Sequence, residues 1–225
     1  MKITITKDYL GKILPLSVLT AVLTLSFWSV LRAQEKVGEI SFYQGTVEVK
    51  RANRLTKVSL NQDVLVGDVI TTGANSRASI RLVDKSQVLL DQRTVYEAKA
   101  AENILTKGAV FVKAAKQKVG GDKEYRVKTP SAVAAVSGTE FFLLEIDKGS
   151  PLTVLGNTYD EGASIVVAEG TIDFSNDVGR VRIKDNQWGL LKKGQRPTPP
   201  VDVDASKFIP EWVKEVLDAE GKAQD

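Results

Sequence analysis

The sequence predicts an all-β domain flanked by two helices, and two observations carry the prediction. From Val37 to about Trp188, apolar and polar residues alternate in short runs, as in strands with one buried face. Clusters of Gly, Asn and Asp separate these runs at close spacing, which is typical of turns between strands. No segment of this region keeps a helical period over three turns.

Residues 1–33 are predicted to be a signal peptide or an N-terminal membrane anchor. Three lysines within residues 1–12 precede Ile13–Leu31, a run of 19 uncharged residues. This order directs a chain through a membrane with its N-terminus in the cytoplasm. As a helix the run is roughly 28 Å long, about one hydrocarbon thickness, which slightly favours an uncleaved anchor. The alternative is cleavage at Ala33–Gln34. Whether or not the segment is cleaved, the rest of the chain, which we call the body, is predicted to be extracytoplasmic, in the periplasm or cell envelope.

Composition limits the chemistry of that body. The 225 residues include no cysteine and no histidine. The chain therefore forms no disulfide and no thiolate metal site, and it lacks the commonest general base and metal ligand. We predict that it is not an enzyme and that it needs no cofactor or metal.

The charge distribution argues against a nucleic-acid partner. The net charge is +3, and residues 1–33 supply all of it. The remainder is balanced, with 27 basic and 27 acidic residues. A neutral body lacks the basic footprint of nucleic-acid-binding proteins.

The most apolar stretch of the predicted β region spans residues 127–144. Val127–Val136 and Glu140–Leu144 are predicted as two strands separated by a tight break at Ser137-Gly138. A run this apolar must be covered on most of its surface, so we expect it in the core.

Three segments of the β region resemble one another. Residues 45–49, 108–112 and 170–174 each begin with glycine, a small residue and an aliphatic residue, and their glycines lie 63 and 62 positions apart. A glycine turn that enters a strand recurs in many β proteins, so the spacing can arise without a repeat. Alternatively, each pass around a coiled or stacked core begins in the same way.

The C-terminal part is predicted to be a tether and a helix. Residues 195–204 contain three prolines and are predicted to be an extended linker that cannot continue a sheet. Residues 205–220 have the pattern of an amphipathic helix, with Phe208, Trp212 and Val216 on its apolar face. Such a helix most often packs on its own domain; the functional alternative is that these three residues dock a partner protein.

Several segments together resemble the FecR-type domain. Gly67–Gly73, Ser76–Leu82 and Asp84–Ser86 are similar to its Gly-Asp, Ser-x-Ala and Asp-Gly-Ser segments, and Lys128–Phe141 to its Thr-Pro and Arg-Gly-Thr segment. The resemblance covers roughly residues 38–145 of a β domain that we place at 34–194. It implies a solenoid-like or coiled β architecture, whereas composition equally allows a β-sandwich. Turn chemistry predicts structural roles for the family-motif residues, which are Gly67, Asp68, Thr71, Ser76, Asp84, Ser86, Thr129, Pro130, Gly138 and Thr139.

The sequence departs from the family pattern in three ways. Lys85 stands where the family usually has Gly, and we expect a type I turn that needs no positive φ there. Ser137 stands where Arg is common. Only 12 residues precede the apolar run, so we expect a stand-alone member without the cytoplasmic sigma-factor-binding segment of the signalling members.

The resemblance implies a non-enzymatic envelope domain with a protein-interaction, signalling or scaffolding role. Its expected partners are envelope proteins, bound through an exposed strand edge or the Trp212 helix, and the membrane if the N-terminal segment is uncleaved. A glycan- or peptidoglycan-binding module is the alternative, which requires Tyr96, Tyr159 and Trp188 to line a groove. A regulator linked to sigma-factor signalling is a more distant possibility.

Overall fold

The computed structural model describes residues 34–116 and 124–222. The predicted N-terminal apolar helix therefore lies outside the described residues. The described residues from Glu35 onward belong to one compact unit, Glu35–Asp225. Within it, no helix combines the length and the apolar character that crossing a membrane requires.

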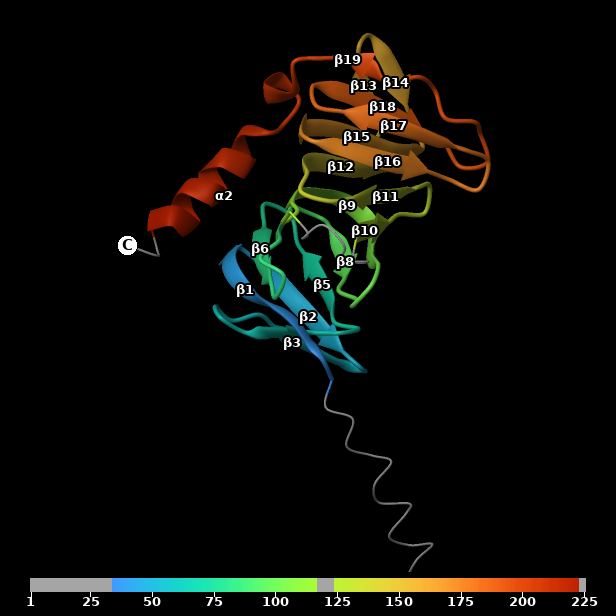
Figure 1. Ribbon diagram of the computed structural model, residues 1–225. Coiled ribbons are helices and arrows are strands. Elements are labelled where there is room, and N and C mark those ends of the chain that lie inside the picture. Colours follow the sequence, from blue (N-terminus) through green and yellow to red (C-terminus); the bar gives the residue numbers. More distant parts are fainter. Residues whose placement is uncertain (1–33, 117–123, 223–225) are drawn as a thin grey trace, which may run out of the picture. The chain divides into compact units, whose positions relative to one another are not determined.

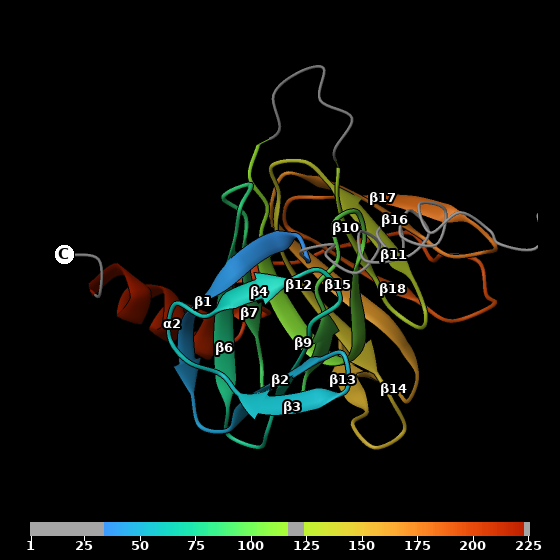
Figure 2. The same ribbon diagram turned by 90° about the horizontal axis from the view of Figure 1, so that it is seen from below.

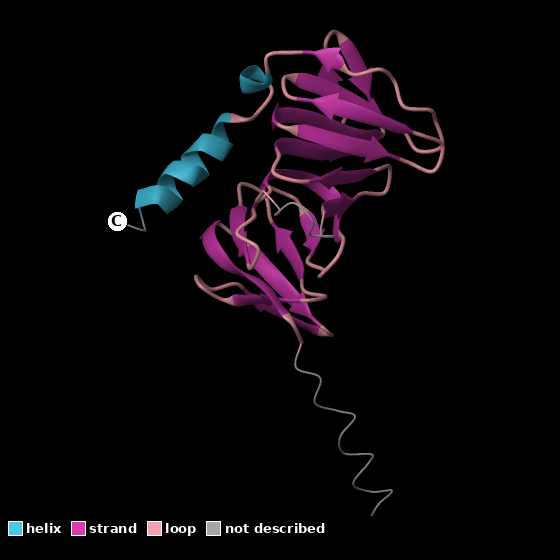
Figure 3. Ribbon diagram, viewed as in Figure 1, coloured by secondary structure: helices cyan, strands magenta, loops and turns pink. Residues whose placement is uncertain are grey.

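Strands dominate the described residues, and helix is confined to the C-terminal part (Figure 3). The predicted mostly-β class with a C-terminal helix is therefore confirmed. The strands are β1 (Lys36–Gln44), β2 (Val47–Arg51), β3 (Arg54–Lys57), β4 (Asp63–Leu65), β5 (Val69–Thr72), β6 (Arg77–Leu82), β7 (Gln87–Leu90), β8 (Val95–Glu97), β9 (Asn103–Lys113), β10 (Tyr125–Lys128), β11 (Val133–Val136), β12 (Glu140–Ile146), β13 (Leu152–Val154), β14 (Asn157–Tyr159), β15 (Gly162–Glu169), β16 (Thr171–Ser175), β17 (Arg180–Lys184), β18 (Gln187–Leu191) and β19 (Val201–Asp202).

Two sequence predictions about element boundaries were wrong. The apolar stretch 127–136 is divided between β10 and β11, because Thr129–Ala132 forms a turn closed by the Thr129 side chain. The proline-rich segment does contribute to a sheet, since Val201–Asp202 pairs with β18 beyond the last proline.

Hydrogen bonds join the strands into two ladders, apart from β13 and β14, which pair only with each other (Figure 1). Sheet A has the order β4-β1-β6-β7-β9-β12-β15-β18-β19. Sheet B has the order β3-β2-β5-β8-β9-β10-β11-β16-β17. All these pairs are antiparallel except β9–β10, and β9 belongs to both sheets. Strand order advances along both ladders almost in step with the sequence, while the chain crosses repeatedly from one sheet to the other.

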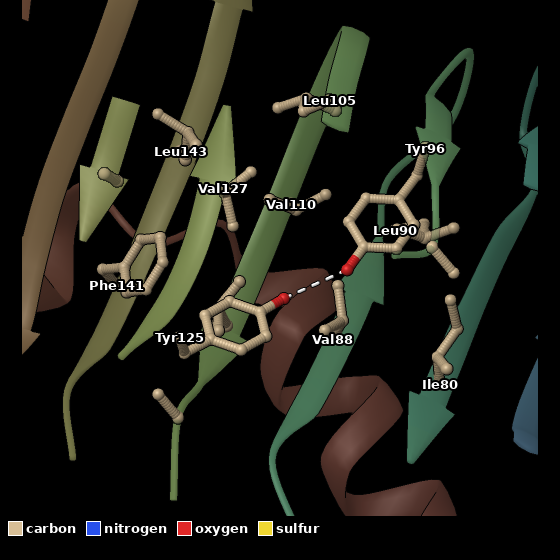
Figure 4. Close-up of a cluster of buried hydrophobic side chains, with 14 of the residues drawn as sticks. Ile80, Val88, Leu90, Tyr96, Leu105, Val110, Tyr125, Val127, Phe141 and Leu143 are labelled. Carbon is tan, nitrogen blue, oxygen red and sulfur yellow. Dashed lines mark hydrogen bonds between the residues drawn. The ribbon is translucent and has the colours of Figure 1, made fainter. Parts of the chain in front are cut away.

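Side chains from both sheets fill one apolar core (Figure 4). In β12 of sheet A, Phe141 and Leu143 are fully buried in it, and in sheet B Tyr96 and Val127 are buried with them. The intervening Phe142 points to the other side of sheet A, where it joins a separate apolar cluster. Period-two alternation therefore sorts residues between the core and the outer face.

Glycine occupies three of the places where the chain passes from one sheet to the other. Gly45 links β1 to β2, Gly108 lies where β9 changes sheets, and Gly170 links β15 to β16. Their φ angles are +74°, +88° and +95°, a region that favours glycine. Each of these glycines packs against the hydroxyl of a buried Ser or Thr, so an added Cβ would lie 2.5, 2.4 or 2.9 Å from that oxygen. The three similar segments thus form the same structural corner.

The turn between β6 and β7 differs from the prediction. Lys85 has a φ of +71°. The Lys85 N–H donates to the Leu82 carbonyl, and the Leu82 N–H donates to the Ser86 carbonyl. This pattern is a type I turn followed by a left-handed residue, a three-residue hairpin loop in which glycine is preferred at the last position. The preference accounts for the family's usual glycine where this chain has Lys85.

Candidate functional site

Gly67 and Asp68 form the turn between β4 and β5. The Asp68 carboxylate is fully buried and accepts two hydrogen bonds from the Arg51 guanidinium, at 2.8 and 2.7 Å, and one from the Leu65 N–H. The bond to Asp68 raises the pKa of Arg51. Because three donors hold the carboxylate, it joins the strands around this turn together.

Thr71 lies within β5, and Ser76 is the last residue of the β5–β6 connection. Thr71 is half-buried in β5, whereas Ser76 is buried. The Ser76 Oγ accepts the Thr46 N–H at 2.9 Å and donates to the Ala74 carbonyl. Ser76 is the hydroxyl that packs against Gly45, so it fixes one of the corners.

Asp84 and Ser86 stabilise the β6–β7 hairpin. The exposed Asp84 accepts the Ser86 N–H at 2.8 Å. The Ser86 Oγ is buried and accepts the Ala115 N–H, which connects the hairpin to the segment after β9.

The later motif residues form two more turns. The buried Thr129 side chain accepts the N–H groups of Ser131 and Ala132, while Pro130 beside it is exposed. Gly138 has a φ of +65°, and the buried Thr139 donates to the Thr171 carbonyl at 3.1 Å. Thr139 is also the hydroxyl against Gly170.

Apart from Thr71, which lies within β5, the motif residues therefore occupy turns and connections at different places, and the fold does not bring the ten together into one pocket. A hollow of about 450 Å³ borders Thr129 and Pro130, and its other lining residues are Lys99, Ala101, Glu102, Ile104, Thr106 and Lys128. No group of three or more potential metal-binding side chains is found in residues 34–116 and 124–222.

The C-terminal helix corrects the docking hypothesis for Phe208, Trp212 and Val216. The helical region divides into a 3₁₀ turn (Ala205–Lys207) and α2 (Glu211–Lys222), with Phe208 between them. Trp212 and Val216 are buried against Leu89 and Phe111 of sheet A, and Phe208 packs in a second cluster beside Trp188. Trp212 and Val216 are therefore covered by the chain's own strands and offer little free surface to a partner, whereas Phe208 is half-buried.

The Trp212 ring also has a polar neighbour. The Arg77 guanidinium carbon lies 5.2 Å from the centre of that ring, in a cation–π contact, and Arg77 reaches Glu215 of the same helix at 3.8 Å. Helix α2 is thus held on sheet A by apolar contacts and by this arginine.

The aromatic residues of the glycan alternative do not line an exposed groove. Tyr96 is fully buried in the core, and Trp188 is 6% exposed and donates through Nε1 to the Ser164 hydroxyl. Tyr159 is half-buried, with its ring centre 5.9 Å from that of Trp188. The side chains required for sugar stacking are therefore used in packing.

The sequence prediction missed a buried acid, Glu145. The side chain lies on the core face of β12 and accepts the Ser131 hydroxyl at 2.6 Å, while its Oε2 has no hydrogen-bond partner within the described residues. Burial raises the pKa of the Glu145 carboxyl. The signal was present in the alternation, because Glu145 shares the parity of the buried Phe141 and Leu143.

Comparisons with known proteins give one family match and a weak likeness to solved structures. The model of the FecR protein family matches residues 68–173. No curated protein matches the chain. Crystal structures at 1.65 and 2.50 Å resolution of a protein from Parabacteroides distasonis ATCC 8503, provisionally described as an anti-sigma factor, align at 18% identity with a TM-score of 0.48. The alignment covers 62% of this chain and 62% of that protein, which is less than two thirds of its length.

The family match confirms the resemblance and shifts its limits, since it begins at Asp68 and ends at Asp173, within β16. It includes the motif residues from Asp68 to Thr139 and two of the three glycine corners, at Gly108 and Gly170. Residues 68–173 of the chain are therefore similar to the FecR protein family.

Proposed function

We propose that this protein is a non-enzymatic binding protein of the cell envelope, in which the FecR domain recognises another protein and so takes part in signalling or scaffolding. The proposal includes an extracytoplasmic body that residues 1–33 direct through the cytoplasmic membrane. It also includes a coiled β architecture over residues 34–194, supported by strand order that advances along both sheets.

One observation carries the proposal: buried polar residues of the family motif make hydrogen bonds within the fold. Asp68, Ser76, Ser86 and Thr139 are buried, and each is hydrogen-bonded to backbone or to a strand-joining arginine. They hold corners and turns, as a scaffold requires. Because these residues have structural roles, we expect the protein to act through its exposed surface, by binding another protein.

The absence of histidine and cysteine from the whole sequence supports the same proposal. Acid–base and nucleophilic catalysis at neutral pH most often employ these side chains. The carboxylates that remain in the motif are bound to arginine or to turn N–H groups, which reduces their availability for chemistry.

The experiment is site-specific photocrosslinking of the full chain in its native cells. A photoreactive residue replaces, one at a time, the exposed Leu55, Val83, Leu155 or Val178, which are distributed over different strands and loops. The expected result is a crosslinked adduct with an envelope protein from at least one position. The protein in that adduct should also be digested by protease added to cells whose outer layer has been permeabilised, because it lies outside the cytoplasmic membrane. Recovery of the body only in the cytosol, or the absence of a protein adduct from every position, would contradict the proposal.

A further inference from the structure

Strand β17 ends sheet B and leaves one side open. It pairs with β16 along its whole length, and no other described strand pairs with it. Figure 2 shows β17 beside β16, with β11 following. A strand in this position presents unpaired backbone groups to its surroundings.

The hydrogen-bond pattern identifies which backbone groups face outward. The Asn176 N–H donates to Gly179 at one end of the hairpin, and the Asp185 N–H donates to Gly170 at the other. In an antiparallel pair, hydrogen-bonded and non-hydrogen-bonded positions alternate. Val181 and Ile183 are therefore bonded to β16, whereas the N–H and C=O groups of Arg180 and Arg182 point to the open side.

The side chains along this edge are basic on one face. Arg180, Arg182 and Lys184 are exposed, and Ile183 is buried in the core. The side chains of Arg180 and Arg182 are 69% and 66% exposed, and both approach a single carboxylate, Asp173. Asp173 is the only acidic residue of β16, whereas β17 carries three basic residues, so these two strands keep an excess of positive charge.

We infer that the open edge of β17 binds an extended protein segment that carries an acidic residue at every second position. Such a segment would add to sheet B as a new strand, accepting and donating hydrogen bonds at Arg180 and Arg182. Its alternate acidic side chains would then lie on the same face as the three basic residues, because cross-strand neighbours share a face. The inference rests on the proposed function and specifies the surface and the partner.

A second copy of the chain is a poor occupant of this edge. The opposite end of sheet B is β3, whose side chains are all exposed and include Arg54 and Lys57. The Val58 N–H donates to the Val47 carbonyl, which shows which positions of β3 are hydrogen-bonded to β2. The N–H and C=O groups of Leu55 and Lys57 therefore point away from β2. Pairing of β17 with β17 or with β3 would bring basic residues together, which is unfavourable.

The test uses the full chain in detergent micelles and a fluorescein-labelled peptide of six alternating glutamate and valine residues, with fluorescence anisotropy as the readout at low salt. Arg182→Pro removes the outward N–H and keeps the backbone bonds to β16; it also removes the Arg182 side chain and its bonds to Asp173, a loss for which Arg182→Ala is the control. The double variant R180E/R182E reverses the charge. Arg182→Pro and the double variant are each expected to weaken binding by about tenfold or more. The matched control is Leu55→Pro, which removes an outward N–H from β3 and is expected to change affinity by less than about twofold.

Three results would overturn the inference. The first is no binding of the peptide by the unmodified chain. The second is unchanged binding by Arg182→Pro with loss in R180E/R182E, since charge alone would then explain the attraction. The third is binding to phosphatidylglycerol vesicles, but not to the peptide, through the same arginines, which would assign the edge to a membrane.

Two controls keep the outcome readable. Circular dichroism checks that each variant is folded. Where Arg182→Pro is not, the unmodified chain is tested with a peptide N-methylated at alternate residues, which is expected to lose binding by the same factor. Crosslinks to a protein from Leu55, Val83 or Leu155 combined with failure of the peptide would contradict only the β17 inference and would leave the proposed function supported.

Discussion

The Tyr96 hydroxyl lies 3.1 Å from the Tyr125 hydroxyl inside the apolar core (Figure 4). The two rings come from β8 and β10, which flank β9 in sheet B. Burial is the main cause that raises the pKa of both phenols, so they remain protonated at any ordinary pH. A polar pair therefore holds together three strands at the centre of the domain.

Removal of one member of this pair should cost more than removal of both. Tyr96→Phe leaves the Tyr125 hydroxyl without its partner and is expected to lower the free energy of unfolding by about 1–3 kcal/mol. The double variant Y96F/Y125F is expected to recover most of that loss, because no buried hydroxyl then remains unpaired. Urea unfolding of the single and double variants measures the difference; additive losses would contradict the interpretation.

The glycine corners give a prediction with a matched control. Gly108 and Gly67 both have a φ of +88°. A Cβ at Gly108 would lie 2.4 Å from the Thr94 Oγ1 and 2.7 Å from its Cα, whereas a Cβ at Gly67 meets nothing within 4 Å. Gly67→Ala should therefore cost only the backbone strain, about 1 kcal/mol, and Gly108→Ala about 3 kcal/mol or more. Equal losses in urea unfolding would show that the close contact with Thr94 is unimportant.

Helix α2 should detach when its anchor is truncated. Trp212→Ala removes the aromatic ring that fills the cluster with Leu89 and Phe111, and we expect the docked helix to lose about 3 kcal/mol of stabilisation. Brief digestion with proteinase K should then remove the C-terminal segment faster than in the unmodified chain. Lys214→Ala is the control, since Lys214 is exposed on the other side of α2; similar digestion of both variants would argue against docking through Trp212.

Glu145 should make stability depend on pH. Burial raises its folded-state pKa above 4.5, so the stability that comes from protonation is complete below pH 4.5 and is lost as the pH rises through the folded-state pKa. Glu145→Gln cannot ionise and does not undergo that loss. We expect the thermal midpoint of the variant, relative to the unmodified chain, to be higher at pH 7 than at pH 4. A midpoint difference that is constant between these pH values would exclude a buried ionisation at this position.

Local patterns predicted the strands well because successive side chains of a strand alternate between its two faces, so a buried face appears as an apolar residue at every second position. The alternation in β12 identifies Phe141 and Leu143 as core residues, and Gly138 marks the turn before them. The backbone conformation of a turn was harder to predict where its residues are compatible with two turn types. Lys85 is compatible with a turn of either sign of φ, and only the bonds to Leu82 and Ser86 decide between them.

Contacts between distant segments could not be predicted from the same patterns. The apolar face around Trp212 has one sequence signature whether it packs on its own sheet or on a partner. The burial of Tyr96 and Trp188 likewise depends on which strands lie beside them. The open edge of β17 is defined by the strand order of sheet B, a property of the whole chain, and no local sequence signal marks Arg180 and Arg182 as edge residues.

The recurring corner at Gly45, Gly108 and Gly170 has a consequence for how such a protein can change in size. In the coiled architecture that we propose, each corner brings the chain to the next level of the stack, and neither sheet has to close on itself to complete the structure. Duplication of one interval of about 62 residues would therefore lengthen the domain by a further level and leave the existing levels intact. Relatives with longer or shorter bodies can then arise by gain or loss of whole levels.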